Sequence, residues 1–409
     1  MRYDQTTLPN GLEIVGEYNP EALTMATGFF CRTGARDETA AENGVSHFLE
    51  HMMFKGTETL DYDAINKTFD RLGARYNAFT SEENTVYFGQ VLPEFQGDLL
   101  ALLAQMMRPA LRDADFEMER NVILEEIAMY ADQPLWVAHD HCRRLHFGSH
   151  PLGALVLGTT DSIKALARDQ MADYCARRYA ADNLTLAFSG RYDWEAGVAA
   201  AQALCGAWQP SGADRALAGV NSGRGVDARR DERFNQVHCY LMAPGVPAQS
   251  DDRLAAAVAA AAIGSGEASR LHWALVDPGI AEAASLGHDE EDHCGTYSGV
   301  LICSPGNAQR ALDLYRGELE RAQTEGLRED EVTRAVRRFG SGAVFQAESP
   351  LHRLVNVGFD WVYRRRVTPL SEFVSRLRAI RAEDCNRVLA QRPFDRLAVA
   401  CIGPLDALG

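Results

Sequence analysis

The sequence lacks any apolar run of the about 18 residues that a membrane-spanning helix needs, so we expect no membrane contact. The apolar, alanine-rich stretch at 254–264 is too short to span and fits a buried core helix. The N-terminus also lacks the charged and then apolar pattern of a signal peptide. We therefore expect a cytoplasmic protein.

Lysine is scarce and closely spaced cysteine pairs are absent. Only three of the 41 basic residues are lysine, and the net charge is −16. That charge argues against nucleic-acid binding, which depends on basic patches. The nine cysteines include no Cys-x-x-Cys pair, and an odd count without a signal peptide is typical of reduced cytosolic thiols.

Several catalytic motifs are missing as well. The sequence contains no serine-centred nucleophile elbow. The glycine-rich turn at 264–266 lacks the Lys-Ser/Thr of a phosphate-binding loop. The segment 139–150 is rich in histidine, but its spacing matches no zinc pattern, so we interpret it as structural.

The motif that is present is His47-Phe48-Leu49-Glu50-His51, which has the form His-x-x-Glu-His. It inverts the common zinc-protease order His-Glu-x-x-His. Because a helix turns about 100° per residue, His47, Glu50 and His51 share one face, while the neighbouring apolar residues form a second stripe that can be buried. This face can hold a zinc ion and a base, but zinc needs at least three protein donors.

A third donor can come from the segment 113–134. Apolar residues recur there at helical spacing, and Asp113 suits the N-cap of such a helix. Glu119 and Glu126 are seven positions apart and therefore share a face of that helix. Glu125 is the competing donor.

Together these segments resemble the M16, or pitrilysin-type, metallopeptidases. The similarity is greatest to the subgroup of mitochondrial processing peptidase β subunits and short bacterial processing-protease-like proteins. It rests on the His-x-x-Glu-His motif followed by the segment ERNVILEEIAMY at 119–130, and on LGARYNAFTSEENTVYF at 72–88 and HPLGALVLGT at 150–159. It covers most of residues 1–205.

The resemblance implies a zinc-dependent endopeptidase that acts on peptides or unfolded, presequence-like segments. One zinc ion per chain would be held by His47, His51 and Glu126. Glu50 would be the general base, and Glu119 would support the catalytic site. Zinc with three protein donors keeps a position open for water and lowers the pKa of that water, so the reaction is hydrolysis without a covalent intermediate.

A substrate-binding strand is expected after a helix at about 61–72 that Gly73 ends. Residues Asn77, Ala78, Phe79 and Thr80 form the first strand of a predicted hairpin, with its turn at 81–84. The resemblance implies that this strand pairs with the backbone of the substrate. An ordinary covered strand is the alternative.

The Gly-, Ser- and Arg-rich segment 211–228 is interpreted as a linker between a zinc-bearing half, 1–210, and a half without a metal motif, 229–409. The resemblance implies an α+β fold with two related halves, each an antiparallel sheet packed with helices (the LuxS/MPP-like metallohydrolase fold). In the second half we predict strands at 236–242 and 297–303 and helices at 251–263, 307–325 and 328–348.

The second half departs from the family pattern. Single-chain active members carry an arginine and, seven residues later, a tyrosine that hold the substrate. Here these positions fall at Leu275 or Val276 and at Glu282, and Arg270 belongs to the preceding turn. The resemblance therefore implies a heterodimer with a homologous subunit that carries the Arg/Tyr pair, with a homodimer as the alternative. A catalytically silent assembly subunit is the competing interpretation.

Overall fold

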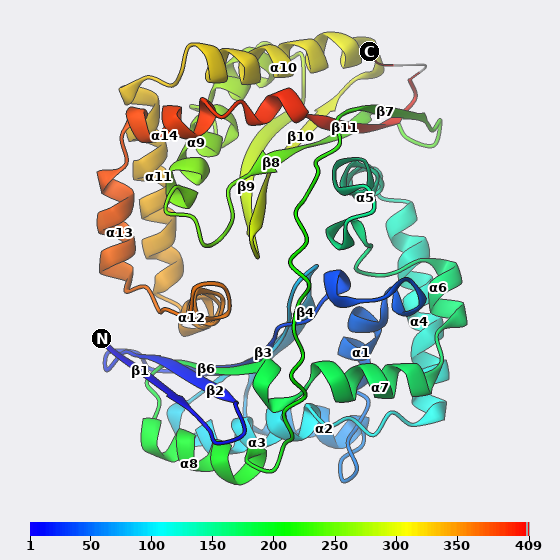
Figure 1. Cartoon of the computed structure of the whole chain (residues 1–409), viewed down its shortest axis with the longest axis vertical. Coiled ribbons are helices and arrows are strands. Elements are labelled where there is room, and N and C mark those ends of the chain that lie inside the picture. The colour runs from blue at the N-terminus through cyan, green and yellow to red at the C-terminus, as the bar shows by residue number, and fades with distance from the viewer. Residues whose placement is uncertain (406–407, 409) are drawn as a thin grey trace. The chain divides into compact units, whose positions relative to one another are not determined.

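The structure, a computed structural model, describes residues 1–405 and 408. Its contacts group the chain into two compact units (Figure 1). Unit 1 contains Met1–Ile127, Ala154–Ala216 and Gln346–Thr368, and unit 2 contains Ala128–Gly153, Leu217–Phe345 and Pro369–Gly409.

Unit 1 is built on a six-stranded sheet in the order β1-β2-β6-β3-β5-β4. Its pairs are antiparallel except for the parallel pair of β2 and β6. The strands are β1 (Arg2–Thr7), β2 (Glu13–Tyr18), β3 (Met25–Cys31), β4 (Arg75–Thr80), β5 (Thr85–Val91) and β6 (Leu184–Gly190). The predicted hairpin is therefore formed by β4 and β5, and β4 is the last strand in this order.

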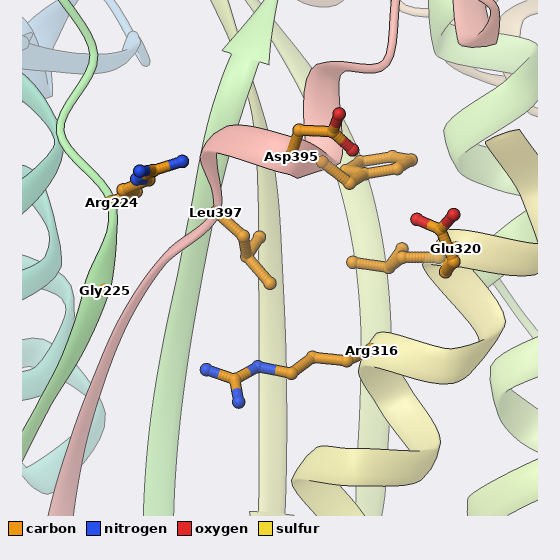
Figure 2. Close-up of a pocket in the computed structure, with 8 residues that line it drawn as sticks. Arg224, Gly225, Arg316, Glu320, Asp395 and Leu397 are labelled. Carbon is orange, nitrogen blue, oxygen red and sulfur yellow. The ribbon is translucent and has the colours of Figure 1, made fainter. Parts of the chain in front are cut away.

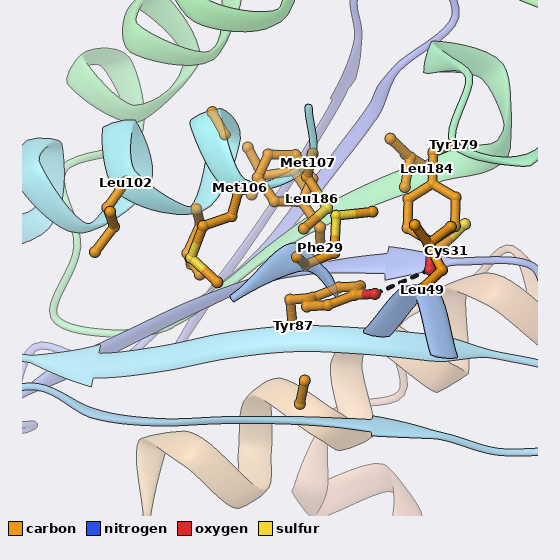
Figure 3. Packing of buried hydrophobic residues seen from close by; sticks show 14 of the residues in the cluster. Phe29, Cys31, Leu49, Tyr87, Leu102, Met106, Met107, Tyr179, Leu184 and Leu186 are labelled. Atoms are coloured by element: carbon orange, nitrogen blue, oxygen red, sulfur yellow. Dashed lines mark hydrogen bonds between the residues drawn. The ribbon is translucent and has the colours of Figure 1, made fainter. Parts of the chain in front are cut away.

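Both faces of the unit 1 sheet are covered, which explains why β3 is buried along its whole length. Phe29 faces one core, in which the hydroxyl groups of Tyr87 and Tyr179 form a hydrogen bond of 3.0 Å (Figure 3). Phe30 faces the opposite side and packs with residues of helix α12 (Pro350–Arg364). The other helices of unit 1 are α1 (Val45–Met53), α2 (Tyr62–Arg71), α3 (Gln96–Met106), α6 (Thr160–Ala165), α7 (Arg168–Arg178) and α8 (Trp194–Cys205).

Unit 2 contains a five-stranded sheet in the order β7-β11-β8-β10-β9, antiparallel except for the pair of β7 and β11. Its strands are β7 (Gly225–Arg230), β8 (Val237–Gly245), β9 (Ala283–Glu291), β10 (Cys294–Cys303) and β11 (Ala398–Gly403). Cys239 and Cys401 face each other in register and are joined by a disulfide. The expectation that all thiols are reduced is therefore wrong for this pair, because strand register is not visible in cysteine spacing.

The helices of unit 2 include three of the sequence predictions. Helices α9 (Arg253–Gly264), α10 (Ala308–Thr324) and α11 (Glu329–Ala347) match the predicted positions, as do strands β8 and β10. The remaining helices are α5 (Pro134–Phe147), α13 (Leu370–Ala379) and α14 (Ala382–Leu389). Helix α4 (Asp113–Ala131) begins in unit 1 and ends in unit 2. None of the described helices is long and apolar enough to cross a membrane.

Each sheet is covered on one face by a helix from the other half of the chain. Helix α12 packs on β2, β3 and β6 of unit 1, and α5 packs on β8 and β11 of unit 2. The α+β class with two mainly antiparallel, helix-packed sheets is confirmed. The boundaries 1–210, 211–228 and 229–409 stay a prediction. The two compact units do not follow chain order, because segment 128–153 belongs to unit 2 and segment 346–368 belongs to unit 1.

Candidate active site

Helix α1 carries the His-x-x-Glu-His motif and begins at Val45. It is preceded by Gly44, whose φ of +92° is unfavourable for other residues. A Cβ at this position would also approach Ile163 and the Leu157 carbonyl too closely. Gly44 has no capping side chain, so the cap comes from Glu38: its carboxylate accepts from Gly44 N at 2.7 Å and Ser46 N at 2.8 Å. Burial raises the pKa of Glu38 to about 7, although these donors oppose the shift.

The apolar face of α1 connects it to α4. Phe48 is fully buried and stacks on Phe116 of α4, with ring centroids 4.7 Å apart. Burying such a side chain stabilises the fold by roughly 1.5–3 kcal/mol. The contact aligns the histidine face of α1 with the glutamate face of α4.

Three donors meet between these helices. His47 Nε2 and His51 Nε2 each lie 3.7 Å from Glu126 Oε2, and one donor atom from each of these residues lies within 4.8 Å of the others. Among the described residues, no other group of three His, Cys, Asp or Glu side chains is gathered in this way.

This donor set fits a zinc ion. Two imidazoles and one carboxylate are the ligand types of catalytic zinc sites, which keep the fourth position open. Bonds of about 2.1 Å in a tetrahedron place donors about 3.4 Å apart, close to the 3.7 Å separations of this structure. His47, His51 and Glu126 are thus the residues that would hold the metal.

Glu119 lies behind His51 and outside the donor set. Its Oε1 lies 2.8 Å from His51 Nδ1, and its Oε2 lies 2.6 Å from Lys55 Nζ. Accepting the Nδ1 proton leaves Nε2 of His51 directed at the metal position, as expected of a carboxylate–histidine–zinc arrangement. Sequence reasoning did not find Lys55, although it follows His51 by four positions.

The pKa values of the two histidines are shifted in opposite directions. Burial lowers the pKa of His47 to about 3, so it is neutral and can bind a metal. Burial also opposes the charge on His51, but the hydrogen bond to Glu119 and the nearby carboxylates outweigh it and raise the pKa of His51. Burial opposes ionisation of Glu119 too, but His51 and Lys55 lower its pKa overall. Burial raises the pKa of Glu126.

Glu50 is held by strand β4. Thr80 Oγ1 donates to Glu50 Oε2 at 2.6 Å, and burial raises the pKa of Glu50 although this hydrogen bond opposes the rise. A base with a raised pKa beside the metal position is suited to moving a proton near neutral pH. Thr80 stays a predicted substrate-binding residue through its backbone, while its hydroxyl contacts the base.

The remaining residues of the predicted substrate strand lie on β4. Asn77 is exposed, Phe79 is half-buried and Ala78 is buried against the core. β4 pairs with β5 on one side and ends the strand order of this sheet. Its other side therefore offers the unpaired backbone groups of an edge strand, on which an extended peptide can add.

Glu125 is exposed and takes no part in the donor cluster. The histidine-rich segment 139–150 lies on α5 and the turn after it, and no cluster of donors is found among its described residues. Neither feature forms a metal site in this structure.

The positions in unit 2 at which the family resemblance would place an arginine and a tyrosine are occupied by Leu275 or Val276 and by Glu282. Leu275 is buried in the core of the unit, and Glu282 accepts a hydrogen bond from Gln236. Arg270 forms a bidentate pair with Glu331, with both N–O distances 2.8 Å. Arg270 follows the turn as a helical residue and is committed to its pair with Glu331.

A cavity of about 490 Å³ lies in unit 2 between α10 and the segment before β11 (Figure 2). Arg224 and Arg316 line it together with Leu397. Its two acidic residues, Glu320 and Asp395, are paired with Arg392 at 3.0 and 2.8 Å. Neither carboxylate belongs to the donor cluster found among the described residues, so the cavity is not the candidate active site.

Comparison with known proteins identifies two family models along the chain. The model described as "Insulinase (Peptidase family M16)" matches residues 13–160, which include all three donors. The model described as "Peptidase M16 inactive domain" matches residues 165–339. The order agrees with a zinc motif in the first half and none in the second.

Relatives match along nearly the whole chain. An uncharacterized zinc protease of Streptomyces coelicolor is 30% identical over 98% of this chain and 89% of its own. A probable mitochondrial-processing peptidase subunit beta of Schizosaccharomyces pombe is 28% identical over 99% and 92%. The crystal structure of a protease from Helicobacter pylori shares the fold, with a TM-score of 0.91, 18% identity and coverage of 98% and 99%. The chain belongs to peptidase family M16, as its motifs predicted.

Proposed function

We propose that this chain is a zinc-dependent endopeptidase that hydrolyses peptides or unfolded, presequence-like segments, with one zinc ion per chain. The observation that carries the proposal is the meeting of His47, His51 and Glu126 donors within 4.8 Å. Glu50, oriented by Thr80, stands on the same helix face as the two histidines. The naming of relatives as zinc proteases supports the same metal.

The side chains divide the work of hydrolysis. Zinc, when bound, supplies the Lewis acidity that acidifies water and polarises a carbonyl group. Glu50 takes a proton from water and returns it to the leaving amine. Glu119 keeps His51 in the tautomer that presents Nε2. The edge of β4 at Asn77, Ala78, Phe79 and Thr80 binds the substrate backbone as an added strand.

We further propose that the chain works as the zinc-bearing subunit of a heterodimer. Leu275 or Val276, and Glu282, stand where an arginine and a tyrosine would hold the substrate, and Arg270 is paired with Glu331. A relative named as a β subunit of a processing peptidase is consistent with this arrangement. The partner would be a homologous chain that carries the missing pair.

The test is the Glu50→Gln variant, with Glu125→Gln as the matched control on the exposed face of α4. We expect Glu50→Gln to lower the peptide cleavage rate by about 10²–10⁴-fold while zinc content stays at one per chain. Glu125→Gln should leave both unchanged. Equal activity of Glu50→Gln and wild type would contradict the assignment of the base.

The competing function is a catalytically silent assembly subunit, favoured by the absent Arg/Tyr pair. It predicts a wild-type chain that binds zinc but cleaves no peptide, alone or with any homologous subunit. The same assay, run with and without the partner, therefore separates the two functions.

A further inference from the structure

The segment that follows the first half of the chain includes a buried arginine. Residues 211–216 belong to unit 1, and the side chain of Arg215 is 1% exposed. Arg215 Nε and Nη2 donate to the two carboxylate oxygens of Asp37 at 3.0 and 2.8 Å, and Nη2 also donates to the carbonyl of Glu83. An arginine in a flexible linker would be exposed to solvent. The buried Arg215 instead fixes this segment to unit 1.

Arg215 belongs to a cluster of buried charges. Arg36 Nη1 donates to Glu83 Oε1 at 2.5 Å, and Arg178 Nη2 lies 3.1 Å from Asp37 Oδ1. All five side chains are less than a tenth exposed. Buried charges depend on their partners, so removing one member shifts the others.

One arm of this cluster reaches the metal helix. Asp37 is followed directly by Glu38, whose carboxylate accepts hydrogen bonds from the amide of Gly44, just before α1, and from the amide of Ser46 in its first turn. Because α1 has no capping side chain of its own, the place of Glu38 sets where the helix begins. The residue at which α1 begins in turn sets the directions in which the His47 and His51 side chains point.

The other arm reaches the base. Glu83 lies in the turn between β4 and β5, three residues after Thr80. The backbone of this turn is joined to the segment before α1, since Arg36 N donates to Glu82 O at 2.7 Å. Thr80 ends β4 and donates to Glu50. Movement of the turn therefore moves the group that orients Glu50.

We infer that Arg215 is a positioning residue of the zinc site, which holds the cap of α1 through Asp37 and the turn that carries Thr80 through Glu83. The inference rests on the proposed function of the site. It assigns to the segment between the predicted halves a part in metal binding and in proton transfer.

The test compares Arg215→Gln with Arg353→Gln. Arg353 is a matched control because it is also buried in unit 1 and forms a bidentate pair, with Glu17, on α12 and β2. Zinc dissociation constants are measured by chelator competition without substrate, and kcat and KM with an unstructured peptide. We expect Arg215→Gln to weaken zinc binding by about 10-fold or more and to lower kcat by about 10-fold with KM within about twofold.

Arg353→Gln should lower the melting temperature by a similar amount while zinc affinity and kcat stay at the wild-type values. Wild-type zinc affinity in Arg215→Gln, or an equal loss in both variants, would overturn the inference. If Arg215→Gln does not fold, Asp37→Asn removes the same charge pair with little change of shape and is measured in the same way. A wild type that binds zinc but cleaves nothing contradicts the proposed function, while the zinc comparison still decides the inference.

Discussion

Glu119 shows how single residues control the candidate site. Its carboxylate receives His51 Nδ1 at 2.8 Å and Lys55 Nζ at 2.6 Å, and its side chain is only 4% exposed. Both of its carboxylate oxygens therefore contact His51 or Lys55, and Glu119 is not one of the three metal donors.

Replacing Glu119 with Gln should weaken zinc binding about 10–100-fold, because a ligand loses the acceptor that orients it. Zinc affinity is measured by competition with a chromophoric chelator. Glu117→Gln is the control, since Glu117 lies on the same helix with its side chain 63% exposed. Equal zinc affinities in the two variants would show that the His51–Glu119 contact does not matter for the metal.

The same contact predicts a pH dependence. Burial lowers the pKa of His51, but the hydrogen bond to Glu119 and the charges of Glu119, Glu50 and Glu126 together raise it by more, so the metal-free pKa lies above the ordinary 6.5. Zinc must displace that proton, so zinc affinity should rise with pH and fall as pH drops through this pKa. In Glu119→Gln the pKa of His51 is lower, and the fall should begin at a lower pH. Identical pH profiles for wild type and variant would contradict this account.

Replacing Thr80 with Val should lower kcat by about 10-fold with little change in KM, because Glu50 loses the hydroxyl that orients it. Thr85→Val is the matched control. Thr85 faces Thr80 across the β4–β5 hairpin, and its hydroxyl donates to the Thr33 carbonyl. The kcat and KM of both variants are measured by steady-state kinetics. An equal loss of kcat in both would show that the effect comes from disturbing the hairpin and not from the Thr80–Glu50 hydrogen bond.

At the scale of elements, the site depends on helices that pack on sheets from distant parts of the chain. Helix α12 covers the face of the unit 1 sheet that lies opposite Phe29 and Tyr87, and Gly358 lies against Phe30 there. A Cβ on Gly358 would approach the Phe30 ring to 2.2 Å. The glycine is therefore required by the close approach of helix and strand.

Gly358→Ala should destabilise the protein by about 1–3 kcal/mol, because overpacking outweighs the gain of about 1 kcal/mol that alanine brings to a helix interior. Gly97→Ala is the control in the same unit. Gly97 is exposed on α3 with nothing near its Cβ position, and alanine there should stabilise by about 0.4–1 kcal/mol. Thermal unfolding of the two variants should shift in opposite directions, and two shifts of the same sign would contradict the packing argument.

The sequence was most informative about elements with a local period. The histidine spacing and the apolar stripe predicted α1, and the seven-residue interval predicted that Glu119 and Glu126 share a face of α4. Long-range contacts were not predictable in this way. That Glu38 caps α1, and that α5 and α12 cover sheets of the opposite halves, depends on loop paths that no periodicity encodes.

At the scale of the whole molecule, we expect the chain to need a second subunit. Mixing it with a homologous chain that carries the Arg/Tyr pair should raise the peptide cleavage rate by about 10²-fold, because the substrate is then held against the metal. The rate is measured with an internally quenched peptide, and dimer formation by size-exclusion chromatography. A partner that lacks the pair is the control, and full activity of this chain alone would contradict the requirement.

We propose that His47, His51 and Glu126 of unit 1 bind a zinc ion that is required to cleave internal peptide bonds. The most direct measurement is mass spectrometry of an unstructured peptide incubated with the chain and its partner, before chelation, after chelation, and after zinc is restored. We expect fragments from internal bonds that disappear on chelation and return with zinc. Fragments that persist without zinc, or an intact peptide despite bound zinc, would contradict this proposal.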